Sequence, residues 1–513
     1  MKKIYKYLLL LVLLIVFFSS KLVITFDSTH YLTYIDIFEG VKPFSSWDLV
    51  RGPVFPIIIY ISNLFFGKNV TGILLCMFMF YLVYCYIVYS FCNKVFNDLK
   101  YKKVYISIIC IFAFFNPIIL GYYHTLLTEF VAITLTMLSL FISWKWWMCD
   151  SKKNKILYSL FFIVMITVSY FLKQPYICVV AIPMIISMMY SIIKNKSLKN
   201  ILYNFGTIIA AIIILFVSFF SWNKFLEFKG VDLNSGRDSS SMLSKQLLNS
   251  IDSYKTYVVK NYNEIKNDKY LSKQEKKLAK KVLKNNPIYI IEIYSNKKLL
   301  EKDFLKINKN GNASGTDTIL EITNTFFKYP SLITTNYLKN YCALSSICII
   351  TSDDGVMYSV TNKKDFLHTY ENSLIPYKSF ENGSSIFDYP EERNETVENY
   401  IEYSNQTLFS KIISKFFTMT SVIFKFVIFT EALFLLLLFI IRIIKRKNIK
   451  EKQLYMFSLM LLLFSFLTLI ANALVGSIID RYATICFIPS LIGIIGAIMF
   501  ILRNMRCIYE KRK

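Results

Sequence analysis

A carboxylate, a histidine and an arginine follow the first apolar segment of the chain. Asp27, His30 and Tyr31 come directly after that segment, and Arg51 lies further along the same polar stretch. An arginine can hold a phosphate through paired hydrogen bonds, and a carboxylate can take a proton from an attacking hydroxyl group. These residue types therefore suit chemistry between a phosphate and a hydroxyl group.

A structural interpretation of the same residues stays open. Asp27 would then cap a helix, and Arg51 would extend its guanidinium towards lipid headgroups. Asp36 and Glu39 follow Asp27 on what we expect to be one short helix. Charged residues of these types are ordinary at the edge of a membrane, so the residues alone do not decide between the two interpretations.

Further polar residues fall at other predicted outer turns. Glu129 opens a predicted span, one loop after His124. An acidic residue at the edge of a span usually faces a cavity or a partner, although a solvated interfacial Glu129 would look the same. Lys173 would add positive charge or anchor the interface. Arg481 and Tyr482 follow an aspartate, with which the arginine would form a local ion pair.

Apolar runs long enough to cross a bilayer surround these points. A helix needs about 20 apolar residues to span roughly 30 Å of hydrocarbon. The first run resembles a signal peptide, but it is long and lacks a good cleavage site, so we expect it to be retained. The predicted spans, about ten in all, are 7–25, 70–92, 104–121, 126–144, 156–172, 175–193, 201–221, 416–441, 454–474 and 483–502.

The lysines and arginines set the expected orientation. With the N-terminus in the cytoplasm, every inner segment is basic and the short outer segments are poor in basic residues. Both termini are then cytoplasmic, and the loops 26–69 and 223–415 lie outside. Residues 53–66 are apolar but short for a span, which predicts a helix lying in the interface.

We therefore predict an all-α polytopic bundle with a mixed, mainly helical extracytoplasmic domain. Its parts are an N-terminal membrane module at 1–222, the outer domain at 223–415, and a C-terminal membrane module with a basic tail at 416–513. Within the outer domain, 271–285 is expected to be a Lys-rich helix and 319–341 an amphipathic stretch. Residues 288–293 could be a strand or could continue a helix. Cys342 and Cys348 could form a disulfide or remain two buried thiols.

Composition excludes some classes of function. The chain is 55% hydrophobic and has a net charge of +25. The basic residues sit mostly between apolar runs, so the charge indicates topology and anionic lipid rather than nucleic acid. There are three histidines, which argues against a His-rich metal centre. No cofactor is required, although a divalent metal could still take part. The Lys, Asn, Ile and Tyr bias is typical of a low-GC bacterial genome.

Taken together, these motifs resemble the polyprenyl-phosphate-dependent glycosyltransferases of the GT-C fold, which include the protein O-mannosyltransferases and the aminoarabinose transferase of lipid A. The resemblance covers about 1–220 and 411–505. Its motifs are Asp27 with Tyr31, Arg51-Gly52-Pro53-Val54-Phe55-Pro56, Asn116-Pro117 with Thr128-Glu129, and Arg481-Tyr482 with Pro489.

The resemblance implies an inverting transfer of a sugar from a polyprenyl phosphate to a hydroxyl group of a cell-envelope glycan, lipid or protein. Asp27 would be the general base, Glu129 a second carboxylate near the donor, and Arg51 the ligand of the lipid phosphate. Several relatives carry two adjacent acidic residues where this chain has Asp27-Ser28, which weakens a metal or paired-carboxylate role. The expected substrate-binding residues are Arg51, His30, Tyr31, His124, Lys173, Arg481 and Tyr482.

Other classes of protein remain as alternatives. A surface-polysaccharide polymerase or ligase would also use polyprenyl carriers, but its outer loop would carry arginines for a diphosphate, and 223–415 has only Arg237 and Arg393. A transporter or flippase would show internal repeats, broken helices and charges near the bilayer midplane. A membrane scaffold that binds a partner through its outer loop is a further alternative.

Overall fold

A computed structural model describes most of the membrane part of the chain and a portion of the outer domain. The described residues are 2–18, 31, 34–47, 49, 51–67, 70–97, 99, 101–149, 151–194, 197–233, 254–259, 261–268, 273–285, 289–294, 305–309, 423, 426–428, 430–442, 452–474 and 480–510.

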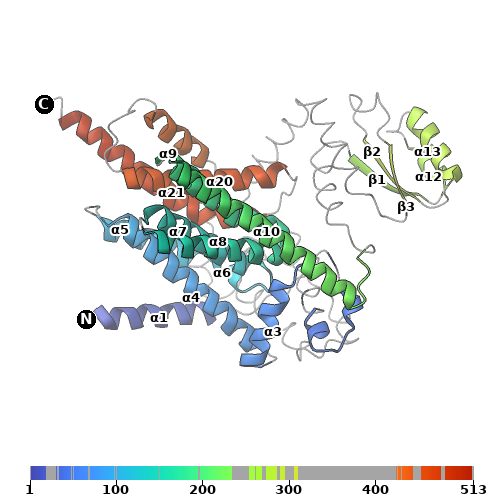
Figure 1. Ribbon diagram of the computed structural model, residues 1–513, viewed down its shortest axis with the longest axis horizontal. Helices are drawn as coiled ribbons and strands as arrows, with labels where there is room; N and C mark the ends of the chain where they lie inside the picture. Colours follow the sequence, from blue (N-terminus) through green and yellow to red (C-terminus); the bar gives the residue numbers. More distant parts are fainter. Residues whose placement is uncertain are drawn as a thin grey trace, which may run out of the picture.

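Helices make up nearly all of the described membrane part (Figure 1). Residues 34–38 and 430–442 are also helical. The helices of the N-terminal part are α1 (Lys2–Phe18), η1 (Phe44–Ser46), α3 (Val54–Phe66), α4 (Val70–Val95), α5 (Lys102–Phe114), α6 (Pro117–Tyr123), α7 (Glu129–Met148), α8 (Lys152–Leu172), η2 (Gln174–Tyr176), α9 (Ile177–Lys194) and α10 (Leu198–Phe228). The C-terminal part contains α20 (Lys452–Leu474) and α21 (Asp480–Glu510).

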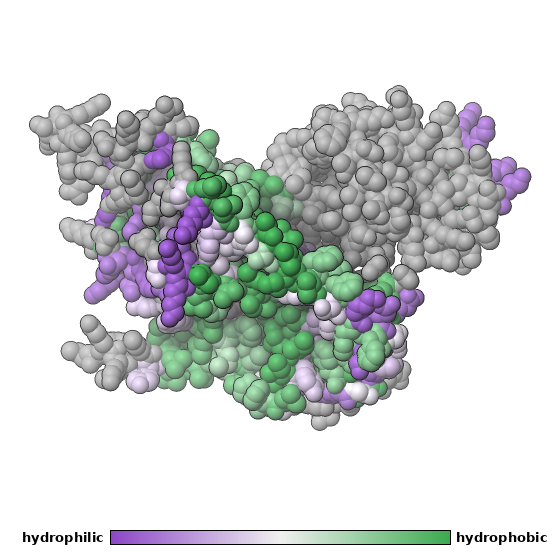
Figure 2. All heavy atoms as spheres, in the orientation of Figure 1, coloured by the Kyte–Doolittle hydropathy of each residue, from purple (hydrophilic) through white to green (hydrophobic). Residues whose placement is uncertain are grey.

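Among the described residues, 7 helices are long and apolar enough to cross a bilayer, which gives the chain the architecture of a multi-pass membrane protein. They correspond to the predicted spans 70–92, 126–144, 156–172, 175–193, 201–221, 454–474 and 483–502. Apolar residues cover the middle of the bundle, and hydrophilic residues gather toward its left end (Figure 2). α7 is the most buried of these helices and α10 the least.

The other predicted helices have three different outcomes. The apolar segment 53–66 forms the short helix α3, as expected, while its position in the interface stays a prediction. α1 ends at Phe18, and the rest of the predicted span 7–25 lies outside the described residues. The predicted span 416–441 is described only in part.

The prediction of one span over 104–121 is wrong, because the chain breaks between α5 and α6. Pro117 has no backbone N–H and disfavours a helical residue before it, so the carbonyl of Ala113 loses its partner. Two tyrosines of α4 replace the missing donors. The Tyr84 hydroxyl donates to the Ala113 carbonyl at 3.3 Å, and the Tyr81 hydroxyl donates to the Phe114 carbonyl. Such replacement is needed where no water can reach the backbone.

The same rule applies at the proline inside α9. Pro183 cannot donate to the carbonyl of Val179, and the hydroxyl of Ser139 on α7 donates to that carbonyl instead. In α21, Pro489 likewise cannot donate to the carbonyl of Ile485, although the helix continues through it. The hydroxyl of Ser465 on α20 donates to the neighbouring carbonyl, that of Cys486, at 3.3 Å.

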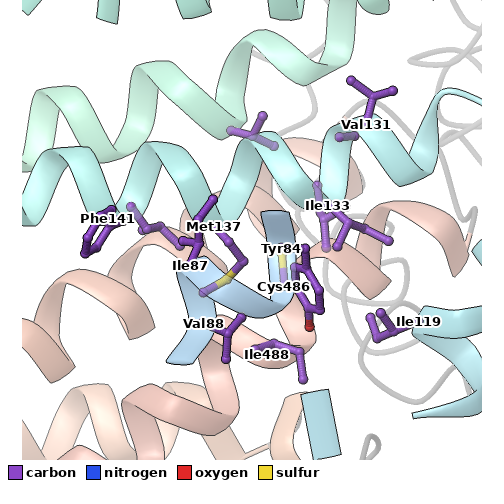
Figure 3. Close-up of a cluster of buried hydrophobic side chains, with 14 of the residues drawn as sticks. Tyr84, Ile87, Val88, Ile119, Val131, Ile133, Met137, Phe141, Cys486 and Ile488 are labelled. Carbon is purple, nitrogen blue, oxygen red and sulfur yellow. The ribbon is translucent and has the colours of Figure 1, made fainter. Parts of the chain in front are cut away.

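The two membrane modules share one core. Figure 3 shows Tyr84 of α4, Ile119 of α6 and Met137 of α7 near Ile488 of α21. In agreement, α21 packs against α20, α7 and α5, and α20 packs against α9. The C-terminal helices therefore complete the bundle built by the N-terminal ones, although nearly two hundred residues of predicted outer domain separate them.

The described part of the outer domain contains a small antiparallel sheet in the order β1-β2-β3. Its strands are β1 (Tyr254–Val259), β2 (Tyr289–Tyr294) and β3 (Leu305–Lys309), with α12 (Asn263–Lys266) and α13 (Lys273–Asn285) beside them. α13 confirms the predicted Lys-rich helix, and β2 decides for a strand at 288–293. The amphipathic stretch 319–341, Cys342 and Cys348 lie outside the described residues.

The ends of the helices sort onto two sides of the bundle. α1 begins and α21 ends on one side, and the three-stranded sheet lies on the other (Figure 1). On the first side, Lys94 at the end of α4 and Lys145 at the end of α7 both lie over the Phe141 ring, at 5.6 and 4.5 Å. Helix ends that the sequence assigned to one side of the membrane thus lie together.

Replacing Ser139 with Ala should lower stability by about 1 kcal/mol, because the Val179 carbonyl would lose its donor inside the bundle. Thermal unfolding in lipid or detergent measures the change. Ser143→Ala is a matched control one turn further along α7, since the Ser143 hydroxyl has no hydrogen-bond partner among the described residues. Equal losses of stability in the two variants would contradict this account. So would an undiminished loss of stability when Ser139→Ala is combined with Pro183→Ala.

Candidate functional site

A buried carboxylate stands at the first residue of α7, the central helix. Glu129 has no exposed surface. The Tyr176 hydroxyl donates to one of its oxygens at 2.7 Å, and the Thr128 hydroxyl donates to the other at 3.3 Å. Tyr176 belongs to η2 and is itself buried. The short 3-10 turn between α8 and α9 therefore fixes the position of Glu129.

Arg51 approaches the same end of α7 through a chain of aromatic rings. Its guanidinium carbon lies 4.8 Å from the centre of the Tyr31 ring, within cation–π distance. The Tyr31 ring meets that of Phe55 edge to face at 4.7 Å, and Phe55 meets Phe130 at 5.7 Å. Phe130 is the residue after Glu129. Tyr31 and Arg51, which the sequence proposed as site residues, thus belong to an aromatic cluster that reaches the residue next to Glu129.

The residue after Arg51 must be small because the backbone packs tightly there. A Cβ atom on Gly52 would overlap the carbonyl of Phe171, near the end of α8. Lys173 follows α8 and precedes Tyr176 in the same turn. The contact at Gly52 therefore brings the Arg51 segment to the turn that carries Lys173, so two cationic residues lie on segments around the Glu129 carboxylate.

A second aromatic group secures the first outer loop to the end of α10. The Trp47 ring lies 5.3 Å from that of Trp222, and the Phe44 ring lies 5.6 Å from that of Phe225. In the same loop, the carboxylate of the buried Asp36 forms an ion pair with the side-chain ammonium group of Lys42 at 3.4 Å. These contacts fix the loop before Arg51, and the contact of Gly52 with Phe171 fixes it after Arg51, so the segment is not a free surface strand.

His124 makes contacts of a different kind. Its two ring nitrogens lie 2.7 Å from the carbonyl oxygens of Leu120 and Phe17. Burial lowers the pKa of this ring, against the opposing effect of the two carbonyls. The contact ties the turn after α6 to the end of α1, just before the segment that carries Asp27. Its predicted role in binding substrate stays a prediction.

Several predicted site residues are not placed by the structure. Asp27 and His30 lie outside the described residues, and Arg481 and Tyr482 are described only as backbone in the first turn of α21. Within the described ranges, no group of three or more His, Cys, Asp or Glu side chains could hold a metal ion.

Sequence reasoning missed two residues. Tyr176 holds Glu129, and its signal was its place beside Lys173 in a predicted outer turn. Glu431 lies inside the predicted span 416–441, and an acidic residue within a span is by itself a functional signal. Glu431 is fully buried and accepts a hydrogen bond from Ser490.

No family model, curated protein or solved structure matches the chain.

Substituting Gly52 by Ala should destabilise the protein by about 2 kcal/mol, because the added methyl group must displace either the Arg51 segment or the end of α8. Gly206→Ala is the matched control, since a Cβ there meets nothing within 4 Å on the exposed helix α10. Thermal unfolding compares the two variants. A Gly52→Ala variant as stable as Gly206→Ala would show that the close contact with Phe171 does not exist.

Proposed function

We propose that the chain is a membrane glycosyltransferase of the GT-C type that moves a sugar from a polyprenyl phosphate to a hydroxyl acceptor with inversion. The acceptor would be a glycan, lipid or protein of the cell envelope. The observation that carries this proposal is the cluster of Tyr31, Phe55 and Phe130 rings, which links Arg51 to the start of α7, where the buried Glu129 lies. A cation and a buried carboxylate are the two groups that such a donor requires.

In the proposed reaction, Asp27 removes the proton of the acceptor hydroxyl as its oxygen attacks the anomeric carbon. The bond to the phosphate oxygen breaks, and polyprenyl phosphate leaves with the additional negative charge. Arg51 stabilises that charge from a fixed position, and Lys173 adds positive charge nearby. Tyr176 keeps Glu129 oriented toward the donor. The lipid tail of the donor would stay in the bilayer, which accounts for a polytopic enzyme.

The proposed orientation places this site on the outer face of the plasma membrane of a bacterium. Both termini would be cytoplasmic, and the 223–415 domain would bind the acceptor or close the site. Support comes from the basic residues. Lys94 and Lys145 share one end of the bundle, whereas Glu129 lies at the opposite end of α7 from Lys145.

One observation favours a second candidate, a transporter or flippase of a lipid-linked substrate. Proteins of that class carry charges and broken helices within the membrane. Glu431 is a buried acidic residue inside the membrane domain, and Pro489 lies within α21 beside its partner Ser490. A transporter does not require the site at the start of α7, so we rank this second candidate below the glycosyltransferase.

Release of polyprenyl phosphate from polyprenyl-phosphate sugars tests the proposal directly. Purified protein in lipid, with cell-wall extract as acceptor, should consume one sugar donor, detected by mass spectrometry. Arg51→Lys should lower kcat/KM roughly tenfold or more, because the charge stays while the paired hydrogen bonds are lost. Arg442→Lys makes the same exchange at an exposed position at the other end of the bundle and should leave turnover unchanged.

Asp27→Asn provides the second variant of this assay. Loss of a general base should reduce turnover by about 10²- to 10⁴-fold while the protein stays folded. An Asp27→Asn variant as active as wild type would remove Asp27 from the mechanism. If no polyprenyl-phosphate sugar is consumed by the wild type even with the extract, the transferase proposal fails and the transporter becomes the better account.

A further inference from the structure

Two lysines from different helices converge on one aromatic ring, at the end of α7 opposite to Glu129. The side-chain nitrogen of Lys145, on α7, lies 4.5 Å from the centre of the Phe141 ring, and that of Lys94, on α4, lies 5.6 Å from the same centre. Phe141 is buried, and its ring stacks on that of Trp144. The packing of α4 against α7 therefore holds two positive charges around one fixed ring.

The two ammonium groups repel each other at this position. Each acts unfavourably on the charge of the other. Lys94 is exposed but Lys145 is partly buried, so water screens the repulsion incompletely. Among the described residues, no carboxylate forms an ion pair with either lysine. Long lysine side chains could separate into water, yet these two converge, so the point where they meet suits an anion.

The lysine pair lies at the level where lipid phosphates are found. The apolar spans of α4 and α7 end at Val95 and Met148. At 1.5 Å per residue, Lys94 and Lys145 are only roughly 2 and 5 Å along their helices from those ends. Hydrophilic residues gather on the same side of the bundle (Figure 2). The phosphate groups of a bilayer lie just beyond its hydrocarbon core, within reach of both side chains.

The surface of α4 beside the lysine pair is apolar and exposed. Tyr86 of α4 is close enough to Lys145 to interact with it electrostatically, and its side chain is exposed. Val83, one turn earlier on α4, is exposed as well. Acyl chains can therefore lie along α4 while a phosphate group reaches the two ammonium groups. A soluble phosphate would make no use of this apolar surface.

We propose that Lys94 and Lys145 together bind the phosphate group of an anionic phospholipid in the cytoplasmic leaflet. Each ammonium group donates a charge-assisted hydrogen bond to a phosphate oxygen, and the negative charge between them removes their repulsion. The Phe141 ring keeps both ammonium groups in place through cation–π contacts. The cytoplasmic leaflet is the one that carries anionic lipid in excess, which agrees with the orientation set by the basic residues.

Native mass spectrometry of the full-length protein tests this site without any sugar donor. The protein, freed of lipid in detergent and titrated with phosphatidylglycerol, should bind one lipid saturably. Combining Lys94→Gln with Lys145→Gln should weaken this binding roughly a hundredfold, because two charge-assisted hydrogen bonds are lost. Lys152→Gln with Lys153→Gln is the matched control. It removes the same charge from two exposed lysines at the start of α8, just after α7, and should bind nearly as tightly as wild type.

Two further ligands separate the possible sources of the phosphate group. Phosphatidylcholine should bind more weakly, because its own choline group balances its phosphate. Inorganic phosphate at millimolar concentration should leave bound phosphatidylglycerol in place, because it lacks acyl chains. Displacement by inorganic phosphate would overturn the assignment to a lipid. Equal affinities of the Lys94 and Lys145 double variant and the control would overturn the site itself.

Thermal unfolding shows whether the double variant is folded and whether the repulsion exists. Without phosphatidylglycerol, the variant that lacks Lys94 and Lys145 should unfold at a temperature no lower than wild type, because the repulsion is gone. Adding phosphatidylglycerol should raise the unfolding temperature of wild type and of the α8 control but not that of this variant. A lower unfolding temperature without lipid, or an equal rise with lipid, would contradict the proposal.

Discussion

The arrangement of this bundle depends on one constraint, which is that each backbone carbonyl inside the membrane needs a hydrogen-bond donor. Pro117 and Pro183 each remove a donor, and hydroxyl groups of Tyr84 and Ser139 on neighbouring helices supply new ones. These bonds fix which helices can lie side by side. The break before Pro117 also lets the chain turn early, and the turn leads directly into Glu129 at the start of α7.

The candidate site follows from that framework because two separate segments converge on the beginning of α7. The turn after α8 supplies Tyr176, which holds Glu129, and the same helix end packs against Gly52. The first outer loop brings Arg51, with Tyr31 and Phe55 filling the space to Phe130. A rigid helix start, rather than a loop tip, therefore positions the carboxylate, as precise chemistry requires.

Periodicity and charge were enough to predict much of the fold. Seven spans, the short helix α3 and the Lys-rich helix α13 were each visible as an apolar or amphipathic run. The break at Pro117 was missed because the apolar run continues across it, and hydropathy does not register a missing N–H. Arg51 and Glu129 could be proposed from residue type and sidedness. Tyr176 could not, since its role exists only through a contact between distant segments.

The central claim is that a polyprenyl phosphate binds beside Arg51, near the start of α7. The most direct measurement is photo-crosslinking with a polyprenyl phosphate that carries a photoreactive group beside the phosphate, followed by mass spectrometry of the labelled peptides. This account predicts saturable labelling of the segments around Arg51 and Lys173, which excess unlabelled polyprenyl phosphate removes. Labelling that maps instead to α20 and α21, or that excess ligand does not reduce, would contradict it.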